Sequence, residues 1–90
     1  MERFEYSFES GLQFKIVLGE DGYNVNISGG NLETPLMGTF TSIEKLLGEV
    51  GGVIRANSTF EEFGKLGNAL HPHFGLASKY DVFEMLQMLI

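Results

Sequence analysis

The sequence predicts an α+β fold, an antiparallel three- to four-stranded β-meander with one face covered by two or three C-terminal helices. Three runs near the N-terminus, residues 4–8, 12–18 and 23–28, alternate apolar with polar side chains. Such alternation is typical of strands buried on one face only. Farther along the chain, apolar residues recur at helical spacing behind serine or threonine residues that can cap a helix. The helices must therefore cover the apolar face of the sheet.

The first hairpin is expected to turn at Glu9-Ser10-Gly11, where Gly11 adopts the positive φ that a three-residue loop needs. This register pairs Phe4, Tyr6 and Phe8 with Ile16, Phe14 and Leu12 on the inner face, and Glu5 with Lys15 on the outer face. The second hairpin should pair Ile16 with Val25 and Leu18 with Tyr23. Its turn is then 19–22, with Gly22 at positive φ.

A loop rich in glycine and asparagine follows, and residues 36–40 are expected to form a short fourth strand. The sequence Thr41-Ser42-Ile43-Glu44 has the pattern of a capping box and should open a helix that Gly51-Gly52 ends. The outer face of the sheet is polar, and its composition indicates no binding platform.

A second capping box, Ser58-Thr59-Phe60-Glu61, should open a helix that Pro72 prevents from continuing. Four residues of this helix are predicted to share one apolar face: Phe60, Phe63, Leu66 and Leu70. Ser78 can cap a third helix that runs to the C-terminus. Its apolar arc is predicted to hold Val82, Phe83, Met85, Leu86, Leu89 and Ile90, docked on the sheet or on a second subunit.

Length and charge limit the class of protein. Ninety residues with eight phenylalanines make one α+β domain over residues 1–90. The chain has no cysteine, no signal-like N-terminus and no long apolar run, so we expect a cytoplasmic protein without a membrane segment. Twelve acidic residues against six scattered basic ones give a net charge of −6, which disfavours binding to nucleic acid.

One glycine pair offers an alternative. Gly64-Lys65-Leu66-Gly67 lies within the eight residues 63–70 and resembles the G-K-x-G loop of KH domains, which implies a nucleic-acid-binding module. The other interpretation is that these glycines let the second helix approach another element closely or break it into two turns.

A second alternative is an acidic mimic of nucleic acid, of the type carried by phages and mobile elements. It requires six carboxylates to gather on one face: Glu33, Glu44, Glu49, Glu61, Glu62 and Asp81.

His71-Pro72-His73 is the single histidine cluster of the sequence. Two imidazoles so spaced could share a metal if the fold supplied a third ligand, but the sequence indicates none, so we expect no metal and no cofactor. Candidate partner contacts are instead the connector and the third helix. They comprise His71, His73, Phe74, Leu76 and Met88.

No nucleophile with a base, carboxylate pair or phosphate-binding loop is apparent, so we expect no enzyme. The adjacent Glu61 and Glu62 diverge on a helix and should serve its N-terminal dipole. The function that remains is a small cytosolic protein-interaction module, a regulator or inhibitor of the kind that bacteria or phages carry. Its contact surface would be the 71–77 connector with the third helix, or an open edge strand, of which the first is guarded by charge. Homodimerisation stays open.

Overall fold

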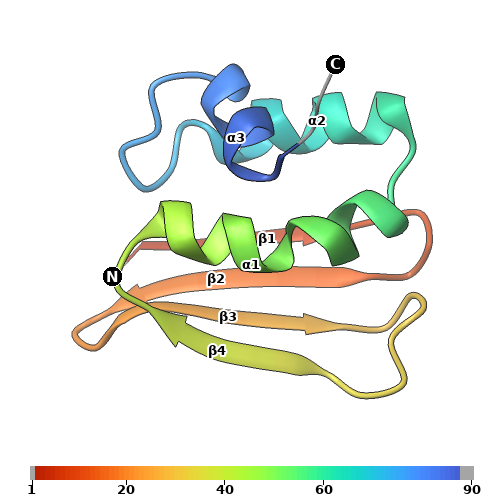
Figure 1. The fold of residues 1–90 in the computed structure, drawn as a ribbon, viewed down its shortest axis with the longest axis horizontal. Helices are drawn as coiled ribbons and strands as arrows, with labels where there is room; N and C mark the ends of the chain where they lie inside the picture. The colour runs from red at the N-terminus through yellow and green to blue at the C-terminus, as the bar shows by residue number, and fades with distance from the viewer. Residues whose placement is uncertain (1, 88–90) are drawn as a thin grey trace.

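The computed structural model describes residues 2–87 and confirms the α+β fold. A four-stranded antiparallel sheet in the order β1-β2-β3-β4 forms the first half of the chain. Its strands are β1 (Glu2–Ser7), β2 (Gln13–Gly19), β3 (Gly22–Ser28) and β4 (Leu36–Phe40). Each strand neighbours the next in sequence, so the sheet is a meander with β1 and β4 at its two edges (Figure 1).

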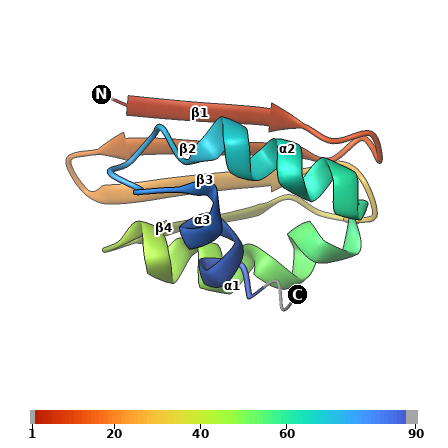
Figure 2. The same cartoon turned by 90° about the horizontal axis from the view of Figure 1, so that it is seen from above.

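Three helices follow: α1 (Ile43–Ala56), α2 (Phe60–Leu70) and α3 (Lys79–Met85). All three lie on the same side of the sheet (Figure 1). Seen from above, α2 lies over the β1 side, α1 lies along the β4 side, and α3 packs between the two helices (Figure 2). One face of the sheet is therefore covered and the other is bare.

Both hairpins have the predicted register. Phe4 pairs with Ile16, Glu5 with Lys15, Ile16 with Val25 and Leu18 with Tyr23. The loop 9–11 is closed by a hydrogen bond from the Phe8 N–H to the Leu12 carbonyl (2.8 Å), and Gly11 has φ +94°. The predicted four-residue turn of the second hairpin is wrong, because Gly19 pairs with Gly22 and two residues, 20 and 21, connect the strands. Gly22 does have the predicted positive φ, +122°.

The core lies between the inner face of the sheet and the helices. Its fully buried side chains come from both layers: Leu12, Phe14, Ile16, Ile27, Leu46, Leu47, Ile54, Phe63, Leu66, Leu70, Val82 and Leu86. The alternation of the strands and the helical spacing of α1 and α2 thus point to a single shared interior.

The predicted end of the first helix is wrong, because α1 continues through Gly51-Gly52 to Ala56. A glycine stands at position 51 because the C-terminal end of α3 approaches α1 closely there. A Cβ on Gly51 would lie 2.6 Å from the carbonyl oxygen of Leu86, the C-cap of α3. The cap also differs by one residue, since Ser42 is the N-cap and accepts from the Lys45 N–H (3.1 Å). Gly51 therefore serves packing between helices and does not end the helix.

The second helix is capped by Thr59, whose hydroxyl accepts from the Glu62 N–H (3.1 Å), one residue later than predicted. The predicted four-residue apolar face is wrong at Phe60, which is 71% exposed, while Phe63, Leu66 and Leu70 are buried. Phe60 is the first residue of α2 and does not belong to the hydrophobic core.

The third helix is shorter than predicted and ends at Met85. Gln87 adopts φ +59°, a left-handed conformation through which a right-handed α-helix cannot continue. Ser78 is the N-cap but makes no side-chain capping bond, and Asp81 instead accepts from the Ala77 N–H (3.2 Å). Leu89 and Ile90, predicted on the apolar arc, lie outside the described residues.

Candidate functional site

The connector between α2 and α3 is tied to the first strand. One Glu2 carboxylate oxygen accepts from the Phe74 N–H (3.1 Å) and contacts His73 Nδ1 (3.1 Å). The His73 ring also packs against Phe4, with 5.6 Å between centroids. Phe74 is buried, and its ring contacts Tyr23 edge-on at 5.7 Å. Most of the surface of Phe74 is thereby taken up by the core, and His73 faces β1.

The other predicted contact residues of this region are partly buried or lie beyond the described residues. His71 is the C-cap of α2 and Leu76 packs against the core, both with intermediate exposure. Met88 falls outside residues 2–87. Within that range no three His, Asp or Glu side chains come close enough to hold a metal ion. The contact role of these five residues stays a prediction.

The glycine pair that resembles a KH loop lies inside α2, where residues 64–67 form continuous helix. Gly67 faces α3: a Cβ there would lie 2.6 Å from a ring carbon of Phe83. Gly64 has no such neighbour within 4 Å. The close-approach interpretation therefore holds for Gly67, and the loop that nucleic-acid clamping needs is not formed by these residues.

One carboxylate has a structural role that the sequence did not reveal. Glu62 is 6% exposed and accepts from the Glu9 N–H (2.8 Å), which ties the first hairpin loop to the start of α2. Burial, and after it the nearby carboxylates of Glu62 and Glu9, raise the pKa of the Tyr6 phenol above its ordinary value of 10.0. Glu62 serves the hairpin rather than an acidic surface.

Three of the other carboxylates, those of Glu44, Glu49 and Asp81, line two different depressions. Glu44 and Asp81 line one shallow depression between α1 and α3, together with Glu84. Glu49 lines another, beside β4. The burial of Glu62 removes one of the six carboxylates that an acidic mimic requires on one exposed face.

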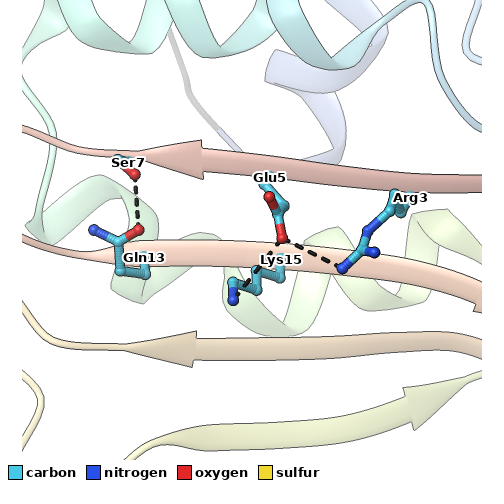
Figure 3. A network of polar contacts seen from close by, with 5 residues as sticks. All are labelled: Arg3, Glu5, Ser7, Gln13 and Lys15. Atoms are coloured by element: carbon cyan, nitrogen blue, oxygen red, sulfur yellow. Dashed lines mark hydrogen bonds and ion pairs between the residues drawn. The ribbon is translucent and has the colours of Figure 1, made fainter.

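The edge at β1 is protected by charge. Arg3 contacts Glu5 (3.4 Å between Nη2 and Oε1), and Lys15 of β2 lies 3.8 Å from the same oxygen (Figure 3). Ser7 donates to the side chain of Gln13 (2.7 Å) on this outer face (Figure 3). Charged residues on an edge strand discourage the addition of another strand.

The backbone groups of β4 can be assigned to its two sides from the hairpin hydrogen bonds. The Phe8 N–H bonds to the Leu12 carbonyl, so Leu12 faces β1. Successive residues of a strand face opposite neighbours, so the register carries this alternation across β2 and β3 to β4. Leu36, Gly38 and Phe40 then bond to β3. Met37 and Thr39 direct their N–H and C=O groups to the open edge.

The open edge, defined as the outward side of residues 36–40, has no charged side chain. Met37 is 74% exposed and Leu36 is 41% exposed, which places them with Phe60 and Tyr80 as the large exposed apolar residues of the described chain. Thr39 donates through its hydroxyl to Asn24 Oδ1 (2.7 Å) on the outer face. The open edge thus combines exposed apolar surface with backbone groups that pair with no strand among residues 2–87.

A shallow depression of about 270 Å³ adjoins the open edge on the helix-covered side. We call it the edge depression; it is lined by Val25, Leu36, Met37, Phe40, Glu49 and Val50. Gly38 lies beside one of the lining side chains, because a Cβ there would be 3.2 Å from Cε2 of the Phe40 ring. The ring therefore lies close to the strand, and Glu49 is the charged group among the lining side chains.

Sequence reasoning named an open edge strand as one of two contact surfaces but did not identify β4. The absence of charge in residues 36–40 was the available signal. Among residues 2–87, no helix has the length and apolar character needed to cross a membrane. No family model, curated protein or solved structure matches this chain.

Proposed function

We propose that this protein is a non-enzymatic protein-interaction module that binds an extended segment of a partner protein by strand addition to β4. The open edge carries the proposal: Met37 and Thr39 offer unpaired backbone groups, and no side chain between residues 36 and 40 is charged. Strand addition to such an edge supplies affinity through backbone hydrogen bonds and specificity through alternate side chains.

The contrast between the two edges supports β4 over β1. The outward positions of β1 include Arg3 and Glu5, which contact each other, while those of β4 are Met37 and Thr39. Folded proteins usually protect an edge strand with charge, proline or a covering element. An edge left uncharged and with 74% of Met37 exposed is suited to a partner strand.

A pair of proline variants tests the proposal, because proline removes one outward N–H from an edge strand without breaking the inward ladder. Thr39→Pro acts on the open edge and Ser7→Pro on β1. Each variant also loses one hydroxyl hydrogen bond to a neighbouring strand, 2.7 Å long in both cases. The two substitutions are therefore matched in their effect on the fold.

The three chains, wild type and both variants, serve as baits in an extract of the source cells. A protein that wild type and Ser7→Pro retain, and that Thr39→Pro loses, is the expected result. Equal retention by all three baits, or loss with both variants, would contradict strand addition at β4. Circular dichroism of the variants establishes beforehand that each is folded.

A further inference from the structure

We infer that the segment added to β4 has an apolar side chain in the edge depression and a basic side chain two residues away that reaches Glu49. This inference rests on the proposed strand addition and specifies the chemistry of the partner. It follows from the side chains that surround the edge depression and from the charge of the neighbouring elements.

Strand alternation determines which partner residues face the edge depression. A strand added to β4 alternates its side chains between the two faces of the sheet. The partner side chains on the helix-covered face lie beside Leu36, Gly38 and Phe40, because the alternation of β4 assigns these three positions to that face. Gly38 has no side chain, so the partner residue opposite it meets the Phe40 ring and the edge depression.

The lining of the edge depression determines whether an apolar or a polar partner residue is preferred there. Four of the six lining residues are apolar and belong to the inner face of the sheet or to α1: Val25, Leu36, Phe40 and Val50. Met37 adjoins the depression at the edge, with its side chain on the outer face by the alternation of β4. An aliphatic side chain placed there would cover Leu36, which is now 41% exposed. Burial of apolar area is favourable by about 25 cal/mol per Å², so a branched aliphatic residue is preferred over a polar one.

The side chains near the edge depression carry a net negative charge. Glu49 lines the edge depression, and residues 31–52, which contain β4, the loop before it and the first part of α1, carry three carboxylates against one ammonium group, a net of −2. That ammonium group belongs to Lys45, which donates to the Thr41 hydroxyl (3.4 Å). The whole chain has a net charge of −6. Charge complementarity therefore favours a basic segment over an acidic one.

The test uses two capped peptides that differ in charge. Both have a central valine and threonine elsewhere, and the residues two positions to either side of the valine are lysine in one peptide and glutamate in the other. The arrangement is symmetric, so the charged residues reach the same face in either strand direction. Binding is followed by backbone amide shifts of the labelled protein, up to millimolar peptide.

The lysine peptide should change the amide chemical shifts of β4 and bind about three- to tenfold more tightly than the glutamate peptide. This range is expected when one exposed ion pair forms with the lysine peptide and is replaced by repulsion with the glutamate peptide. Glu49→Gln should reduce this preference by at least half. Glu44→Gln is the matched control on the same helix, because Glu44 lines the depression beside α3, and it should leave the preference unchanged.

The possible failures are separable. Equal binding of both peptides, abolished by Thr39→Pro, would overturn the inferred chemistry and leave strand addition standing. No amide shift with either peptide at millimolar concentration would overturn both. A wild-type chain that self-associates through β4, shown by a dimer that Thr39→Pro converts to monomer, would assign the edge to a second copy and also overturn the inference.

Discussion

Alanine substitutions at two glycines of α1 should change stability in opposite directions. Gly48 and Gly51 lie three residues apart in the same helix, and alanine is favoured over glycine in a helix interior by about 1 kcal/mol. A Cβ on Gly48 meets nothing within 4 Å. Gly48→Ala should therefore raise the free energy of unfolding by about 0.5–1 kcal/mol.

The same change at Gly51 meets α3. A Cβ there would lie 2.6 Å from the Leu86 carbonyl oxygen and 2.9 Å from Nη1 of Arg55. The first neighbour is backbone, so α3 must move away, and the hydrogen bond from the Arg55 guanidinium to the Leu86 carbonyl is disturbed. Overpacking costs about 1–3 kcal/mol, which outweighs the gain in propensity and leaves Gly51→Ala about 1–2 kcal/mol less stable.

Urea unfolding followed by far-ultraviolet circular dichroism measures both variants. The expected difference between them, about 2–3 kcal/mol, corresponds to a separation in Tm of at least about 8 °C for a domain of this size. Equal stabilisation by both alanines would refute the packing of α3 against Gly51. Destabilisation by both would refute the continuous helix, because alanine is harmful where a glycine occupies a loop at positive φ.

Three further predictions concern the contacts that join the layers. Glu62→Ala leaves the Glu9 N–H without its acceptor and should lower the free energy of unfolding by about 1.5–3 kcal/mol. Glu61→Ala, at an exposed position, should change the free energy of unfolding by less than about 0.5 kcal/mol. Similar values for the two variants in urea unfolding would contradict the buried contact. Because the pKa of Tyr6 is raised, the folded chain keeps a proton that the unfolded chain loses, so the free energy of unfolding should fall as pH rises above 10.0. Tyr6→Phe should flatten that slope in urea titrations at alkaline pH, and an unchanged slope would exclude Tyr6 as its source. Glu2→Ala should speed amide exchange at Phe74, which donates to the Glu2 carboxylate; an exchange rate equal to wild type would show that the contact is not maintained in solution.

The sheet could be predicted closely because its information is local. Alternation in residues 4–8 and 12–18, with one glycine able to take positive φ, determines both the face and the register of the first hairpin. The same reasoning gave the pairing of Ile16 with Val25. A register shift of one residue would have exposed every core side chain of these strands.

The helix ends were predicted less well because they depend on contacts distant in sequence. Gly51 looks like a helix terminator until Leu86 is seen beside it. Glu62 lies in the first turn of α2, as expected for a residue that serves the helix dipole, but its contact with the Glu9 N–H could not be read from the sequence. Phe60 fits the apolar period of α2, but no other element among residues 2–87 covers it and its side chain is 71% exposed.

The candidate site could be predicted only in part. The connector 71–77 drew attention by its histidines and apolar residues, but Glu2, far away in sequence, engages His73 and Phe74. The predicted meander places its last strand at an edge, and the structure confirms this strand order. Because the sequence leaves three or four strands open, it does not decide whether residues 36–40 form that edge, and their lack of charge acquires its meaning only once β4 is established.

Hydrogen exchange at the backbone amides of β4 tests directly whether this strand offers an open edge. In the free chain the amides of Met37 and Thr39 should exchange rapidly, while that of Gly38, bonded to β3, should be protected. On addition of the lysine peptide, Met37 and Thr39 should become protected. Protection of both amides in the dilute free chain, or rapid exchange that the peptide leaves unchanged, would contradict the account.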